Sequence, residues 1–215
     1  MTKQQDQNAD TGDRRNYFRI DDTVRLSLRR VDPKEMPLRL DELEMEAAGN
    51  FTVMSSLAAI TAQMTVGLRR IENRDPDLAA YLRAVDQKIE VIGRAFISQE
   101  PELMAASAIP VNLSAGGICV GVDEVYEPGT HLEIRMLLFP SFNGLLIYGT
   151  VVDGGPVDDD DPLAHDHRYP YRVRIEFTHI RECDRELLIR HLLRRQSDQL
   201  RGRFEQADTD ELDLE

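Results

Sequence analysis

The most constraining feature of this sequence is a long run whose apolar positions repeat with the period of a helix, set between segments that repeat with the period of a strand. From Leu40 to Ile71 the spacing alternates between three and four residues, as along the seam of a coiled coil. The seam positions are Leu40, Leu43, Ala47, Asn50, Met54, Leu57, Thr61, Met64, Leu68 and Ile71. As one helix the run would be roughly 48 Å long at 1.5 Å per residue.

A second helix is predicted after the sequence ENRDPD, because Pro76 cannot continue the first helix and Asp77 is a suitable N-cap. Its apolar residues step by four and three: Leu78, Leu82, Val85, Ile89, Ile92 and Phe96. The pair reads as a helical hairpin. Its seams can satisfy each other within one chain, or they can pair with another copy; Asn50 and Thr61 are polar seam residues of the kind that fix a partner.

Period-two alternation on both sides of the hairpin predicts antiparallel strands. In TVRLSLRRV, the residues Val24, Leu26 and Leu28 alternate with polar ones. Further strands are predicted in IPVNLSAGGICVGV, HLEIRMLLF, LLIYGTVVD and YRVRIEFTHI, and a closing helix in DRELLIRHLLRRQSDQL. In HLEIRMLLF, Glu133 and Arg135 are expected to point outward. The predicted class is α+β: a small antiparallel β-barrel interrupted by a helical insertion.

Composition excludes several partners. The chain has 39 Asp and Glu against 26 Lys and Arg in 215 residues, a net charge of -13, which argues against duplex nucleic acid and anionic membranes as ligands. No apolar stretch predicts a membrane span or a signal peptide, and Cys119 and Cys183 lack metal-ligand spacing. We therefore expect a cytoplasmic protein of bacterial type whose cysteines stay reduced.

Two short segments carry the candidate chemistry. Arg14, Arg15 and Arg19 crowd the entry to the first strand, and arginine offers a planar fork for phosphate oxygens and a flat face for purines. The second segment, NLSAGG, supplies Asn112 and Ser114 as hydrogen-bonding side chains. Gly116 and Gly117 follow, and they permit close approach of the backbone and positive φ. Together the segments suit an anion that carries flat bases, that is, a nucleotide.

This combination resembles the PilZ domain family, receptors for the bacterial second messenger cyclic di-GMP. The family motifs RxxxR and [D/N]xSxxG are matched by RNYFR at 15–19 and NLSAGG at 112–117. The resemblance implies a six-stranded antiparallel β-barrel that holds one cyclic di-GMP molecule or a dimer of it. The arginines would contact phosphates and guanines, with Arg14 as an additional contact, and Asn112 and Ser114 would contact a guanine.

The chain departs from most of the family in the helical insertion between the two motifs. In this respect it resembles a minority of members in which an inserted helix drives tetramer assembly, some of which have lost ligand-binding residues. We therefore expect a homo-oligomer, a dimer or tetramer, through a seam that includes Leu43, Met54, Leu57, Met64, Leu68 and Ile71.

Simpler interpretations remain open for each segment. The arginines alone could be a solvated basic cluster, and NLSAGG could be only a tight hairpin turn. His165, Asp166 and His167 beside the acidic residues 158–161 fit no standard zinc spacing and favour a solvated loop. No nucleophile elbow, P-loop or other catalytic arrangement is present in the sequence.

The predicted organisation is a polar tail over 1–13, a barrel domain over 14–32 and 108–200, an inserted oligomerisation hairpin over 33–107 and an acidic tail over 201–215. The expected function is that of an oligomeric adaptor, not an enzyme. It would bind cyclic di-GMP as its ligand, need no cofactor or metal, and relay the signal to an unknown downstream protein. The alternative is a coiled-coil scaffold with a PilZ-like barrel that no longer binds nucleotide.

Overall fold

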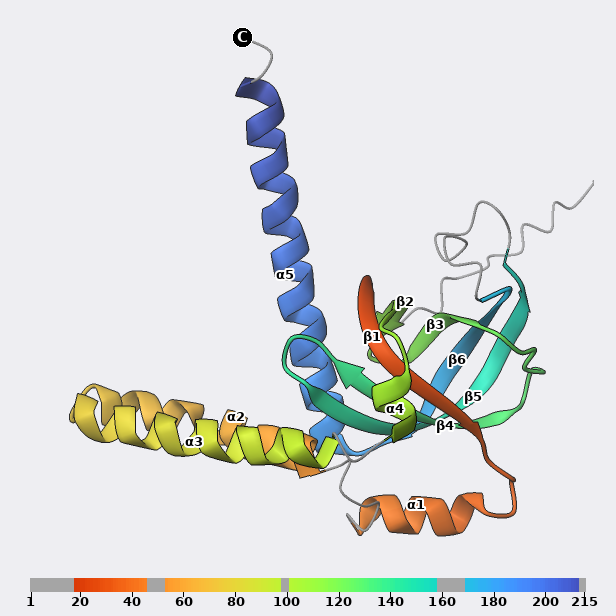
Figure 1. Ribbon diagram of the computed structural model, residues 1–215, viewed down its shortest axis with the longest axis horizontal. Helices are drawn as coiled ribbons and strands as arrows, with labels where there is room; N and C mark the ends of the chain where they lie inside the picture. Colours follow the sequence, from red (N-terminus) through yellow and green to blue (C-terminus); the bar gives the residue numbers. More distant parts are fainter. Residues whose placement is uncertain (1–17, 46–52, 98–100, 158–168, 213–215) are drawn as a thin grey trace, which may run out of the picture.

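A computed structural model describes residues 18–45, 53–97, 101–157 and 169–212, with side chains described as far as Arg201 except at 96 and 97. Six strands form a closed antiparallel barrel in the order β1-β2-β3-β6-β5-β4 (Figure 1). The strands are β1 (Arg19–Arg30), β2 (Ile109–Ser114), β3 (Gly117–Val122), β4 (His131–Leu138), β5 (Asn143–Pro156) and β6 (Tyr171–Ile180). The helices are α1 (Met36–Glu44), α2 (Val53–Glu72), α3 (Pro76–Ile97), α4 (Pro101–Ala105) and α5 (Glu182–Leu212).

Strand β1 closes the barrel, because it pairs with β2 on one edge and with β4 on the other. Its partner β2 follows only after the four helices α1 to α4, so the insertion interrupts the barrel between its first two strands. The predicted α+β class, with a six-stranded antiparallel barrel, an inserted helical region and a C-terminal helix, is confirmed.

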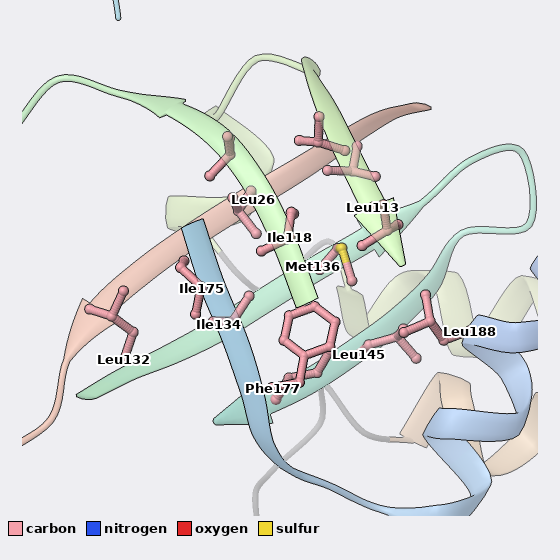
Figure 2. Close-up of a cluster of buried hydrophobic side chains, with 14 of the residues drawn as sticks. Leu26, Leu113, Ile118, Leu132, Ile134, Met136, Leu145, Ile175, Phe177 and Leu188 are labelled. Carbon is pink, nitrogen blue, oxygen red and sulfur yellow. The ribbon is translucent and has the colours of Figure 1, made fainter. Parts of the chain in front are cut away.

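The barrel interior is filled by the apolar residues that alternate along each strand. The set Leu132, Ile134, Met136 and Leu138 of β4 is fully buried, and Figure 2 shows the first three pointing into the interior together with Leu26, Leu113, Ile118, Ile175 and Phe177. Leu187, Leu188 and Leu192 of α5 belong to the same core. Period two therefore decides which side chains face the core.

The wall made by β4 and β5 is buried on its outer side as well. Leu137, Leu146 and Tyr148 face outward into a second apolar cluster that includes Leu43 of α1 and Leu103 of α4. Glu133 points away from the barrel interior as predicted, but this cover leaves it only 3% exposed. Its carboxylate accepts hydrogen bonds from Arg135 Nε at 2.9 Å and from the Tyr148 hydroxyl at 3.2 Å.

The predicted single helix from Leu40 to Ile71 was wrong. Helix α1 ends at Glu44, with its C-cap at Met45, and lies against the barrel, whereas α2 belongs to a hairpin with α3 that projects away from it (Figure 1). Two predicted seam residues are inside the fold: Leu43 is 2% exposed and Met54 is 3% exposed, both in the cluster outside β4 and β5. A three-four spacing of apolar residues predicts an apolar stripe on one side of a helix, but it does not predict which part of the protein packs against that stripe.

The hairpin itself forms as predicted, with a different cap. The Asp75 carboxylate accepts the main-chain N–H of Leu78 at 3.0 Å, so Asp75 caps α3 in place of Asp77. Pro76 is the first residue of α3, where the missing N–H of proline costs nothing. Where the helix backbone of α3 passes α2, Gly93 leaves room for Met54, since a Cβ at Gly93 would lie 2.0 Å from the Met54 sulfur.

Helix α5 is longer than predicted, because it continues through most of the acidic segment to Leu212. Within the described ranges, every helix is too short or too polar to cross a lipid bilayer.

Candidate functional site

The two motif segments meet on the outer surface of the barrel. Arg19 at the start of β1 is the cross-strand partner of Ser114, near the end of β2. Its Nη1 donates to Oδ1 of Asn112 at 3.1 Å, across 93 residues of sequence. Arg14 and Arg15 lie outside the described residues. The structure therefore brings together one arginine of the first motif with the asparagine of the second.

Ser114 serves the turn between β2 and β3. It is only 3% exposed. Its hydroxyl donates to the Gly117 carbonyl at 3.1 Å and accepts the Gly116 N–H at 3.4 Å. The side chain thus closes a turn in which Ala115 and Gly116 connect two paired strands. This local role was the simpler interpretation of NLSAGG, and it places the main chain of the turn beside Arg19.

Gly117 is needed for space, and neither Gly116 nor Gly117 adopts the positive φ that glycine permits. Among the described glycines, positive φ occurs at Gly129. A Cβ at Gly117 would lie 2.4 Å from the Ile175 carbonyl oxygen of β6, so only glycine fits there. The Gly116 carbonyl accepts the Phe177 N–H at 2.9 Å, which ties the turn to the same strand.

The strand register adds residues that the motifs did not indicate. Asn112 stands between Asp21 of β1 and Cys119 of β3, and Cys119 stands opposite Arg174 of β6. Cross-strand partners share a face of the sheet, so these four side chains form one row across the outer surface. The alternation of Arg174 with buried neighbours is visible in the sequence, but the pairing that puts it two strands from Asn112 is not.

Helix α5 fixes the backbone under this row. Asp22, whose side chain is fully buried, accepts His191 Nε2 at 2.5 Å and Arg195 Nε at 2.8 Å. Burial by itself would raise the pKa of Asp22, but the hydrogen bonds from His191 and from the Thr23 main chain, with the charges of His191 and Arg195, lower that pKa below 3.8. The strand beside the candidate site is thus held by an ionised carboxylate.

The metal alternative concerns a different part of the chain. His165, Asp166, His167 and the acidic run 158–161 lie outside the described residues. In the part of the chain that the structure describes, no three His, Cys, Asp or Glu residues gather as metal ligands. Neither Cys119 nor Cys183 forms a disulfide bond.

Comparison with known proteins supports the fold. A family model for the PilZ domain matches residues 69–194, more than half of the chain; β1, with Arg19, precedes the matched stretch. No curated protein sequence matches the chain.

Two solved structures are similar to it. One, from Xanthomonas campestris, is described as a pathogenic protein with a tetrameric PilZ domain self-assembled via a helical bundle; it is 14% identical, with a TM-score of 0.49, over 86% of this chain and 92% of that one. The other, an inhibitor of motility from Bacillus subtilis, is 21% identical, with a TM-score of 0.34, over 43% of each chain.

The NLSAGG turn lies in the closed six-stranded barrel. Strand β1 completes that barrel, although it precedes the residues that the family model matches. Since the family model spans β2 to β6 and most of the chain's length, this protein belongs to the PilZ domain family, a family of cyclic di-GMP receptors.

Proposed function

We propose that this protein binds cyclic di-GMP on the outer face of β1, β2 and β3, with Arg19, Asn112 and the Ser114–Gly117 turn as the described part of the site. The observation that carries the proposal is the contact between Arg19 and Asn112, which unites two segments 93 residues apart at the edge of a tight turn. Arg14 and Arg15 would complete the site from the segment that precedes β1. Gly116 and Gly117 belong to it through the backbone of the turn.

The chemistry of these groups suits a cyclic dinucleotide. Guanidinium groups only donate hydrogen bonds, and each charge-assisted bond to a phosphate contributes about 1.5–3 kcal/mol. Arg19 is exposed at the start of β1, so its guanidinium can turn from Asn112 to a phosphate without disturbing the core. Asn112 can then accept a hydrogen bond from the edge of a guanine.

Isothermal calorimetry with cyclic di-GMP tests the proposal. Wild type should bind, and Arg19→Ala should weaken binding by tenfold or more because one charge-assisted bond is lost. Arg29→Ala is the matched control, since Arg29 is an exposed arginine near the other end of the same strand. Equal affinity of the Arg19 variant and wild type would exclude this site.

We further propose that the protein is an oligomeric adaptor, a receptor rather than an enzyme, that acts in the cytoplasm on a downstream protein. The observation in favour of self-association is the apolar surface of the projecting hairpin. Its exposed apolar residues are Ile60, Met64, Val66, Leu78, Tyr81, Ile89, Val91 and Ile92. Of the predicted seam, Leu57, Leu68 and Ile71 are half-buried and Met64 is 60% exposed, so the outer part of the seam can contact a second copy.

The alternative function is a scaffold that assembles through the same hairpin without binding nucleotide. The exposed apolar residues favour this alternative and the receptor equally, because both need the assembly. Light scattering with and without cyclic di-GMP, alongside the calorimetry, separates them: a scaffold shows an oligomer but no heat of binding.

A further inference from the structure

Asp21 makes a contact that neither motif includes. Its Oδ1 accepts a hydrogen bond from Nδ2 of Asn112 at 2.8 Å, and the two residues are direct cross-strand partners. On the other side of the same amide, Arg19 donates to Oδ1 of Asn112 at 3.1 Å. The asparagine is therefore held between an acceptor and a donor.

This pair of neighbours allows one orientation of the amide. An ionised carboxylate only accepts hydrogen bonds, so Asp21 requires the NH₂ group of Asn112 on its side. A guanidinium only donates, so Arg19 requires the carbonyl oxygen on the other. If the amide turned over, its NH₂ group would face the Arg19 guanidinium, a donor against a donor. Its oxygen would face the Asp21 carboxylate, an acceptor against an acceptor.

The backbone of Asp21 is itself fixed, which makes its carboxylate a defined reference point. Gln199 of α5 donates to the Asp21 carbonyl at 2.7 Å. The next residue, Asp22, is bonded to His191 and Arg195 of the same helix. Three contacts from one helix thus hold the two residues 21 and 22, and Asp21 has little freedom to follow a movement of Asn112.

We propose that Asp21 is a positioning residue of the ligand site: it holds Asn112 so that the amide oxygen faces Arg19 and the ligand, and it makes asparagine, not aspartate, the residue that functions at position 112. This inference rests on the proposed binding of cyclic di-GMP. A guanine presents N–H donors on its N1–N2 edge, which an amide oxygen accepts. An adenine presents a different pattern, so the orientation of Asn112 contributes to the choice of base.

A charge swap tests the proposal. Asn112→Asp alone places a second carboxylate within hydrogen-bond distance of Asp21, and repulsion should weaken cyclic di-GMP binding by more than tenfold. The double variant D21N/N112D restores a donor opposite an acceptor, because the amide at position 21 can donate to the carboxylate at position 112. It should recover most of the lost affinity.

The single variant Asp21→Asn isolates the positioning role. It keeps the size of the side chain but no longer requires the NH₂ group of Asn112 on its side. Once Arg19 turns to a phosphate of the ligand, the Asn112 amide can turn over, so the ratio of affinities for cyclic di-GMP and cyclic di-AMP should fall at least threefold. Asp41→Asn, at an exposed position of α1 away from the site, is the control and should leave the ratio unchanged. A purely structural role of Asp21 would change the melting temperature but not this ratio.

The outcomes separate this inference from the proposed function. Rescue of binding by the double variant supports it, and an unrescued double variant or an unchanged base preference in Asp21→Asn overturns it. If wild type binds no cyclic di-GMP, the proposed function fails. The melting temperatures of wild type, Asp21→Asn, Asn112→Asp and the double variant, measured without ligand, then decide whether the orienting contact exists. A double variant more stable than Asn112→Asp supports the contact, and additive effects of the two substitutions on stability overturn it.

Discussion

At the scale of single residues, Gly117 is a position where an added methyl group would meet the backbone of a neighbouring strand. A Cβ there would lie 2.4 Å from the Ile175 carbonyl oxygen, in the ladder between β3 and β6. Gly117→Ala should therefore lower the free energy of unfolding by about 3 kcal/mol, as overpacking against backbone does. Chemical denaturation followed by circular dichroism measures this.

Gly67 in the interior of α2 is the control for that variant. Nothing lies within 4 Å of a Cβ built on it. Gly67→Ala should stabilise the protein by about 0.5–1 kcal/mol, because alanine has the higher helix propensity. If both alanine variants changed stability in the same direction, the space argument for Gly117 would be wrong.

The free energy of unfolding should depend on pH through the titration of Asp22. Its pKa in the folded state is below the ordinary 3.8, so its contribution is full at neutral pH and is lost as the pH falls through the lowered pKa. Asp22→Asn should cost about 3 kcal/mol at pH 7, because it removes the buried carboxylate that accepts hydrogen bonds from His191 and Arg195. The difference from wild type should shrink below about pH 4, measured by urea unfolding between pH 7 and pH 3. A difference that stayed constant over this range would contradict the assignment.

At the scale of elements, one buried arginine joins the inserted hairpin to the C-terminal helix. Arg181 forms two bonds with Asp184, at 2.8 and 3.0 Å, and donates to Ser55 of α2 at 2.7 Å. Arg181 and Asp184 are 7% and 0% exposed, so the planar fork satisfies a carboxylate that water cannot reach.

Arg181→Lys should therefore destabilise the protein by about 2 kcal/mol or more, because an ammonium cannot make the bidentate contact. Hydrogen exchange should show faster opening of the first turn of α2. Arg190→Lys, in an exposed pair with Glu186, is the control and should change stability by less than about 0.5 kcal/mol. Unchanged exchange in α2 after the Arg181 substitution would show that Ser55 does not hold the hairpin.

At the scale of the whole molecule, the hairpin α2–α3 and the outer part of α5 both extend beyond the barrel (Figure 1). Met64 and Val91 on the hairpin are 60% and 68% exposed. Met64→Glu with Val91→Glu should leave the monomer folded but reduce the mass seen by light scattering, because burying those charges between copies costs several kcal/mol. Gln63→Glu with Gln87→Glu adds the same charge at exposed polar positions and should keep the larger mass. A wild type that is monomeric at micromolar concentration would refute the oligomer.

Much of the fold could be predicted because strand alternation is a local property. The period-two positions Val24, Leu26 and Ile134 face the barrel core because successive side chains of a strand point to opposite faces. Glu133 obeys the same alternation and is still buried, since helix α1 covers its side of the sheet. No pattern within the segment HLEIRMLLF predicts that a helix from another part of the chain packs on this strand.

For the candidate site, the sequence by itself determined the residue types at the two motifs and the turn that Ser114 closes, because a hydroxyl three residues before a carbonyl acts locally. Only the tertiary structure decided that Arg19 meets Asn112 and that Asp21 holds the other side of the amide. Those contacts depend on the register between β1 and β2, which are separated by four helices, and a shift of one residue would turn each side chain to the opposite face. Closure of the barrel sets that register, and closure is a property of all six strands together.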